Sequence, residues 1–124
     1  MTKPLALLVY ENLLSGNQLR IRLQDLGYRV QTMSDTTDLI AFAQQEKPMV
    51  VLIDLVSTNS DTCAAIADIK KNPATVHIPI LAFSGEQHAE LQKAAREAGA
   101  TLVASDAAIL PQLPHLLEQL LRVD

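Results

Sequence analysis

The stretch Met49-Val50-Val51-Leu52-Ile53-Asp54 decides the fold of this chain. It is apolar and rich in β-branched side chains up to its last residue, which is typical of a central strand buried on both faces. Its first charged residue is Asp54. In an open α/β sheet, ligands bind at the carboxyl edge of the strands. The position of Asp54 therefore fits a functional centre and a polar strand-ending residue equally well.

Other apolar runs flank this stretch, and helical patterns separate them. Besides the central strand, we expect strands at Leu5–Val9, Tyr28–Met33, Ile78–Phe83 and Thr101–Ala104. We expect helices at Ser15–Leu26, from a cap at Ser34-Asp35 to Gln45, from a cap at Asp61 to Lys71, at Glu86–Ala98 and over the leucine-rich segment Pro111–Leu121. This alternation predicts an α/β fold with a parallel sheet and crossover helices. Right-handed crossovers favour a doubly wound, flavodoxin-like sheet of strand order 2-1-3-4-5, in one domain spanning residues 1–124.

The composition limits the classes of function. Hydrophobic residues make up 48% of the 124, as in a globular domain, and the net charge is −4. The basic residues are scattered and the aromatic content is 3%, so we expect no direct nucleic-acid binding. A single cysteine, Cys63, excludes an internal disulfide. With no signal-like or membrane-length apolar run, we expect a cytoplasmic protein that does not bind membranes.

Common catalytic and binding motifs are missing from the sequence. His77, His88 and His115 lie in different segments without metal-ligand spacing, so we expect them at the surface or at helix ends. Ser15-Gly16-Asn17 follows the first strand, but a phosphate loop needs more small residues than this single glycine. There is no Walker pattern, Gly-rich dinucleotide fingerprint or nucleophile elbow.

Four segments in sequence order carry a family resemblance: Leu7-Leu8-Val9, Val51-Leu52-Ile53-Asp54-Leu55, Ile78-Pro79-Ile80-Leu81-Ala82-Phe83-Ser84 and Ala95-Arg96-Glu97-Ala98-Gly99-Ala100. In their order and spacing, the chain from Leu5 to about Leu121 resembles the receiver domain of two-component response regulators. The resemblance implies that a carboxylate after the third strand accepts a phosphoryl group from a histidine kinase. Two acidic residues would bind Mg²⁺, and a hydroxyl and a lysine would contact the phosphate. These groups neutralise and hold the charge of the transferred group.

The resemblance transfers to this sequence only in part. It places Asp54 at the phosphoacceptor position and Ser84 at the hydroxyl position. The acidic pair falls on Tyr10 and Glu11, which leaves Glu11 and Asp54 as ligands for a weak or absent Mg²⁺. The lysine position falls on Asp106.

Further positions also differ from the family pattern. Val103 stands where the family has an aromatic switch residue, and Ala107 stands where it has a proline after the lysine. Thr58 and Thr62 stand where it has a proline and a glycine after the phosphoacceptor. The lysine change matters most, because a cation about 4 Å from a phosphate contributes up to ~4 kcal/mol of attraction at an effective dielectric of ~20, and an anion reverses the sign.

We interpret the chain as a degenerate receiver domain that is not an enzyme and that mediates protein–protein contacts without phosphorylation. Its partner would be a histidine kinase or an output domain, or a second copy through the face of the fourth helix, fifth strand and last helix. Candidate residues on that face are Gln92, Lys93, Arg96, Glu118 and Arg122. Two alternatives stay open: a weak phosphoacceptor using Asp54, Glu11 and Ser84, and an unrelated flavodoxin-like cofactor-binding protein.

Two local expectations concern the emptied phosphorylation site. Asp106 could turn outward or cap the last helix, or it could join Glu11 and Asp54 in a cation site. Tyr10 could fill the vacated space and close it to phosphodonors.

Overall fold

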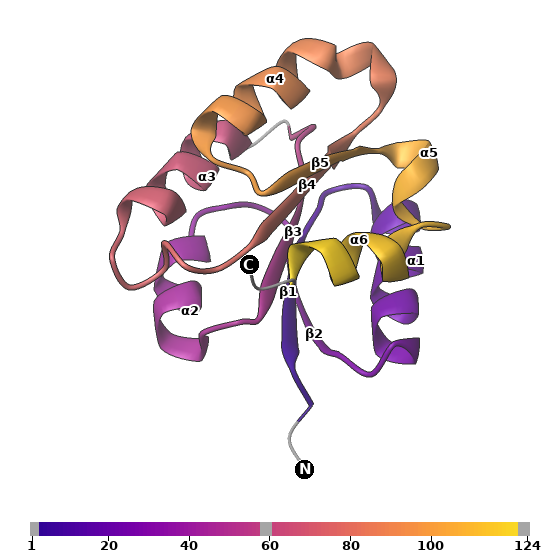
Figure 1. The fold of residues 1–124 in the computed structure, drawn as a ribbon, viewed down its shortest axis with the longest axis horizontal. Coiled ribbons are helices and arrows are strands. Elements are labelled where there is room, and N and C mark those ends of the chain that lie inside the picture. Colours follow the sequence, from indigo (N-terminus) through magenta and orange to yellow (C-terminus); the bar gives the residue numbers. More distant parts are fainter. Residues whose placement is uncertain (1–2, 58–60, 122–124) are drawn as a thin grey trace.

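The computed structural model describes residues 3–57 and 61–121 and contains one five-stranded parallel sheet of order β2-β1-β3-β4-β5. The strands are β1 (Leu5–Val9), β2 (Arg29–Met33), β3 (Val50–Asp54), β4 (Ile80–Ser84) and β5 (Leu102–Ser105). The helices are α1 (Leu13–Asp25), α2 (Leu39–Glu46), α3 (Thr62–Lys71), the 3₁₀ turn η1 (Glu86–His88), α4 (Ala89–Ala98), α5 (Asp106–Ile109) and α6 (Leu113–Leu120). The predicted doubly wound sheet is confirmed (Figure 1).

The sheet lies between two helical layers, each with its own hydrophobic core. On one face α1, α5 and α6 pack on the sheet, and on the other α2, α3 and α4 do so (Figure 1). Side chains alternate along β3, so Val50 and Leu52 enter the first core, whereas Val51 and Ile53 enter the second. All four are fully buried, which explains why β3 is an uninterrupted apolar run.

Capping interactions shift two helix starts from their predicted positions. Helix α1 begins at Leu13 and not at Ser15, because the Asn12 side chain accepts hydrogen bonds from the backbone N–H groups of Leu14 and Ser15. Asp35 does not cap α2, since its carboxylate accepts the N–H of Thr37 within a local turn, and α2 begins only at Leu39. The predicted cap at Asp61 is confirmed, with its carboxylate 3.0 Å from the Ala64 nitrogen.

The helical segments that follow β4 and β5 are each divided into two elements, whereas the sequence predicted one continuous helix after each strand. The helix expected at Glu86–Ala98 begins as the 3₁₀ turn η1 and becomes α-helical at Ala89. The last helix is two short helices, because the Ser105 hydroxyl caps a first turn that ends at Ile109, before Pro111. Helix α6 then buries Leu113, Leu117 and Leu120, the inner part of the expected leucine stripe. None of the helices in the described ranges is long and apolar enough to cross a membrane.

We expect Ser105→Ala to destabilise the domain by about 1 kcal/mol, because the Ala108 N–H loses its cap acceptor. Urea unfolding would measure this loss. Ser105→Thr keeps a hydroxyl at the same place and serves as the matched control. Equal stability of the alanine and threonine variants would contradict the capping role.

Candidate functional site

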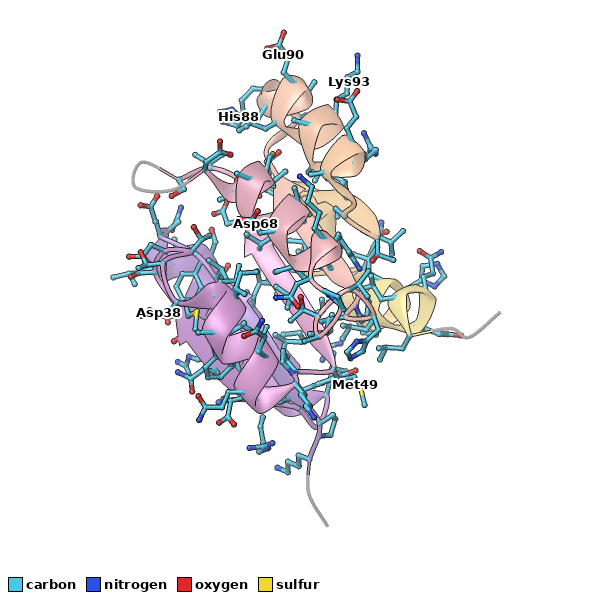
Figure 2. All side chains as sticks on the ribbon, turned by 90° about the vertical axis from the view of Figure 1, so that its left-hand side faces the viewer. Asp38, Met49, Asp68, His88, Glu90 and Lys93 are labelled. Atoms are coloured by element: carbon cyan, nitrogen blue, oxygen red, sulfur yellow. The ribbon has the colours of Figure 1, made fainter. Side chains whose placement is uncertain are left out.

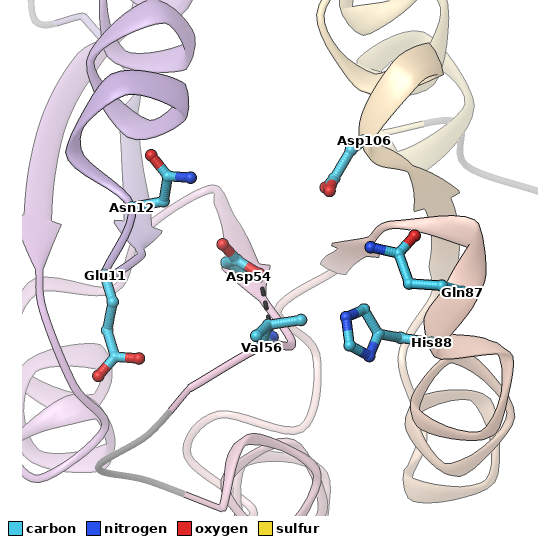
Figure 3. Close-up of a pocket in the computed structure, with 7 residues that line it drawn as sticks. All are labelled: Glu11, Asn12, Asp54, Val56, Gln87, His88 and Asp106. Atoms are coloured by element: carbon cyan, nitrogen blue, oxygen red, sulfur yellow. Dashed lines mark hydrogen bonds between the residues drawn. The ribbon is translucent and has the colours of Figure 1, made fainter.

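A cleft of about 500 Å³ opens at the carboxyl edge of the sheet, around the end of β3 (Figure 3). The lining residues are Glu11, Asn12, Asp54, Val56, Gln87, His88 and Asp106. Three of the residues singled out in the sequence therefore meet here, namely Glu11, Asp54 and Asp106. Tyr10, Ser84 and Val103 do not line this cleft.

Asp54 is the last residue of β3, and its carboxylate is half-buried. One carboxylate oxygen accepts the backbone N–H of Val56 at 3.0 Å, the dashed line in Figure 3. Burial raises the pKa of Asp54 above its ordinary value of 3.8, and the negative charges of Asp106 and Glu11 raise it further. The Val56 hydrogen bond and the nearby His88 oppose this shift of the pKa without cancelling it. The site therefore disfavours negative charge on Asp54.

Asp106 begins α5, directly after the β5 strand, and faces the cleft (Figure 3). It does not cap α5, since the Ser105 hydroxyl makes the cap hydrogen bond to Ala108. Asp106 is nevertheless exposed and is the acidic residue of the first turn of α5, as expected for an outward-turned carboxylate at the N-terminus of a helix. Its charge reaches Asp54 strongly enough to contribute to the raised pKa of that carboxyl. An anion thus stands on the side of the cleft where the family resemblance implies a lysine.

The carboxylates of the cleft do not converge on a metal site. Among residues 3–57 and 61–121, no group of three or more His, Cys, Asp or Glu side chains is arranged to hold a metal ion. Figure 3 shows Glu11 and Asp106 on opposite sides of the cleft, with Asp54 between them. The expected three-carboxylate cation site is therefore not formed among these residues. Mg²⁺ is often held by only one or two carboxylates together with water, so weak binding by Glu11 and Asp54 stays a prediction.

Ser84 lies at the end of β4, as the resemblance implies, but its hydroxyl is fully buried and turned toward α4. The hydroxyl donates to the Gly85 carbonyl at 3.2 Å and accepts from the Gln92 side-chain amide at 3.1 Å. The same amide approaches the carbonyls of Ser84 and Gly85 at 3.3 and 3.4 Å. In this arrangement the Ser84 hydroxyl has its partners already and does not face the cleft.

Tyr10 packs into the core beneath α1 and leaves the cleft open. Its ring is only 9% exposed, and its hydroxyl donates to the Asn17 side chain at 3.4 Å. A side chain on Gly16 would overlap the Tyr10 ring, so this glycine provides the space for it. The expectation that Tyr10 fills the cleft is wrong, because burial of its large apolar ring in the core is more favourable.

Val103 and the segment Ser15-Gly16-Asn17 contribute to the packing of the domain and do not line the cleft. Val103 pairs with Ala82 across the sheet and is packed, partly buried, against the core beneath α2, α3 and α4. Ser15-Gly16-Asn17 lies within the first turns of α1 and forms no open phosphate loop. Thr58, which takes the place of a family proline, lies outside the described residues.

Gln87 and His88 line the cleft, although we had not assigned either residue to the site from the sequence. We expected the histidines at the surface or at helix ends, and His88 does end the 3₁₀ turn η1. It is nevertheless half-buried, and Figure 3 shows its ring facing the cleft next to Val56. Gly85 just before η1 was the available signal, because a glycine after a strand often precedes a change of chain direction.

The fold has many counterparts among solved structures, although no protein-family model matches the chain and a comparison with curated sequences finds no match. A proposed response regulator from Chloroflexus aurantiacus is 18% identical, with a TM-score of 0.89 over 97% of this chain and 98% of its own. The receiver domain of NtrX from Brucella abortus is 22% identical, with a TM-score of 0.85 over 96% and 99%.

The fold is that of a receiver domain. A third structure supports this, the receiver domain of a sensor histidine kinase from Pseudomonas aeruginosa, which is 20% identical with a TM-score of 0.87 over 97% of this chain and 98% of its own. That protein has a magnesium ion coordinated in its active-site cleft. The receiver fold accounts for the position of Asp54 at a ligand-binding edge of the sheet.

We expect Gly16→Ala to destabilise the domain by about 1–3 kcal/mol, because the added methyl group overlaps the Tyr10 ring. An unstrained Gly-to-Ala change inside a helix would instead stabilise by up to about 1 kcal/mol. Urea unfolding of the single variant and of Gly16→Ala in a Tyr10→Ala background would separate the two effects. The overlap argument fails if the alanine costs the same in both backgrounds.

We expect the stability conferred by Asp54 to fall as the pH rises. Its pKa is raised in the folded state, so between the ordinary and the raised pKa the folded protein binds more protons than the unfolded chain. The free energy of unfolding therefore declines through that window, and Asp54→Asn removes this decline. Carboxyl NMR titration should also show a lower Asp54 pKa in Asp106→Asn. An unchanged Asp54 pKa in that variant would mean that Asp106 does not act on it.

Proposed function

We propose that this chain is a degenerate receiver domain that works in cytoplasmic signal transduction as a protein–protein interaction module, without accepting a phosphoryl group and without enzymatic activity. The observation that carries this proposal is the carboxylate of Asp106 in the cleft opposite Asp54. The fold shared with solved receiver domains supports the signalling context.

The charges of the cleft oppose phosphoryl transfer. A phosphoryl group on Asp54 would add negative charge beside Asp106 and Glu11, and no Lys or Arg belongs to the described residues that line the cleft. Transfer depends on charge neutralisation at this place. At about 4 Å and an effective dielectric of ~20, replacing attraction by repulsion is worth up to ~8 kcal/mol before solvent screening. Even a small part of this slows transfer by orders of magnitude.

The surroundings of Ser84 and Val103 support the same proposal. The Ser84 hydroxyl, at the phosphate-contact position, is buried and hydrogen-bonded to Gln92 and Gly85. Val103, at the position of the family's aromatic switch, is a small β-branched side chain held in the core. Neither side chain is arranged to sense a change at Asp54.

The partner in this proposal is a histidine kinase, an output domain or a second copy of the chain, bound through the α4–β5–α6 face. Lys93, Arg96 and Glu118 are exposed there, and Figure 2 shows Lys93 and Glu90 projecting from α4. Gln92 is only half-exposed and is engaged with Ser84, so it is a weaker candidate than the sequence indicated. The fifth candidate, Arg122, lies outside the described residues.

A weak phosphoacceptor remains the second candidate, because the cleft around Asp54 is open and not filled by Tyr10. The two functions differ in a direct measurement. We expect no added phosphoryl mass after incubation with acetyl phosphate and Mg²⁺, measured by intact-mass spectrometry. Asp106→Lys alone should also stay unmodified, because Tyr10 still occupies the position of the second metal-binding carboxylate in this variant.

Two results would contradict this expectation. A stoichiometric adduct on the natural sequence that disappears in Asp54→Asn would establish the phosphoacceptor function. A strong adduct on Asp106→Lys alone would show that the missing metal carboxylate matters less than the charge of residue 106. Asp54→Asn within the Asp106→Lys variant controls for modification elsewhere.

A further inference from the structure

The junction between β4 and α4 is held by a side-chain amide that comes from the helix itself. The Gln92 amide nitrogen lies 3.1 Å from the Ser84 hydroxyl, 3.3 Å from the Ser84 carbonyl and 3.4 Å from the Gly85 carbonyl. The hydroxyl donates to the Gly85 carbonyl at 3.2 Å, and the backbone N–H of His88 donates to the same carbonyl at 3.0 Å. We call the three hydrogen bonds of the amide the Gln92 contacts.

A second glutamine covers this junction from the side of the cleft. Gln87 lines the cleft, and Figure 3 shows its side chain there. A side chain on Gly85 would overlap the Gln87 amide, so the two residues are in close contact. The buried backbone of Gly85 therefore lies between a glutamine of the cleft and the glutamine of α4.

Ser84 lies between the cleft and the α4–β5–α6 face. It directly follows Phe83, which pairs with Asp54 across β3 and β4, and its hydroxyl is fully buried. Through the Gln92 amide it is also joined to α4, which contributes Lys93 and Arg96 to that face. A rotation of the Ser84 hydroxyl toward Asp54 would therefore break a contact with α4.

The partners of the Ser84 hydroxyl determine whether such a rotation is favourable. An ionised carboxylate is a stronger hydrogen-bond acceptor than a neutral carbonyl, so Asp54 would attract a hydroxyl that is free to turn. In this structure the hydroxyl already donates to Gly85 and accepts from Gln92. Turning away would leave buried polar groups without these partners, which is unfavourable.

We propose that the Gln92 contacts make the position of α4 independent of the charge in the cleft, because they hold the Ser84 hydroxyl away from Asp54. Gln92 acts through Ser84 and is a positioning residue. This inference deepens the proposed function, on which it rests: it gives the reason why the α4–β5–α6 face keeps one form whatever the state of Asp54.

The test is a double-mutant cycle that is followed by amide chemical shifts. Asp54→Asn removes the carboxylate charge with little change of shape, and it is introduced with Gln92 present and in Gln92→Leu. Alkaline pH keeps Asp54 ionised in the proteins that retain it. A substitution also avoids titrating the other groups that act on this carboxyl, which are Glu11 from the loop after β1, His88 from η1 and Asp106 from α5.

We expect the two backgrounds to differ in α4. With Gln92 present, Asp54→Asn should change the amide shifts of residues around the cleft and leave those of Leu91 to Ala98 nearly unchanged. In Gln92→Leu, the same substitution should change the shifts of these α4 residues severalfold more. Gln92→Met, with an apolar side chain of similar length, should give the same result and replaces Gln92→Leu if the leucine variant does not fold.

Two further variants distinguish this role from a general loosening of the helix. Ser84→Ala in the Gln92→Leu background should return the α4 changes to their small size, because the hydroxyl that carries the effect is gone. Glu97→Leu is the matched control, since Glu97 is exposed on α4 and introduces a leucine without touching Ser84 or Gly85. It should behave like the natural sequence. Amide spectra verify that each variant is folded.

Four outcomes would overturn the proposal: large α4 changes with Gln92 present, no increase in the folded Gln92 variants, an equal increase in Glu97→Leu, or an increase that persists in Ser84→Ala. Failure of the proposed function is seen separately, as a phosphoryl adduct on the natural sequence. The adduct and the shift changes are different readouts, so either result can fail while the other holds.

Discussion

The burial of β3 on both faces is the constraint on which the rest of this structure depends. Its four apolar residues each contact one of the two cores, so the strand has no room for a polar side chain before its end. The first position at which the chain can bear a charge is Asp54, where the sheet edge meets solvent. Helices on both faces are then required to cover the neighbouring strands, and the loops that connect them form the cleft.

The electrostatics of the cleft follow from how the strands end. Asp54 ends β3 and Asp106 follows β5, so parallel strands bring the two carboxylates to the same edge although 52 positions separate them in the sequence. Neither has a Lys or Arg partner among the described lining residues, and the raised pKa of Asp54 reflects its burial first and these charges second. A site of this kind disfavours further negative charge at the carboxyl edge of the sheet.

The architecture could be predicted from the sequence because it depends on periodicity and on a few caps. The apolar run at Val50–Ile53, the glycine after the first helix and the cap at Asp61 each report a local preference that tertiary packing does not override. The positions of Glu11, Asp54 and Asp106 around one edge followed from the strand order and the family resemblance.

The finer features depend on contacts between distant residues, which a single sequence does not display. The inward turn of Ser84 results from Gln92, eight positions later, and the place of Tyr10 depends on the absence of a side chain at Gly16. The break between α5 and α6 falls at Pro111, directly after the short turn that the Ser105 hydroxyl caps. His88 lines the cleft from the end of the 3₁₀ turn η1, a type of element that single-sequence patterns do not distinguish from the start of an α-helix.

The three hydrogen-bond acceptors of the Gln92 amide all depend on one side chain. They attach α4 to the end of β4 at oxygen atoms of Ser84 and Gly85. A substitution of Gln92 would remove these contacts together and leave the buried Ser84 hydroxyl with one hydrogen-bond partner fewer. The junction between the fourth strand and its helix would then loosen as a unit and not one contact at a time.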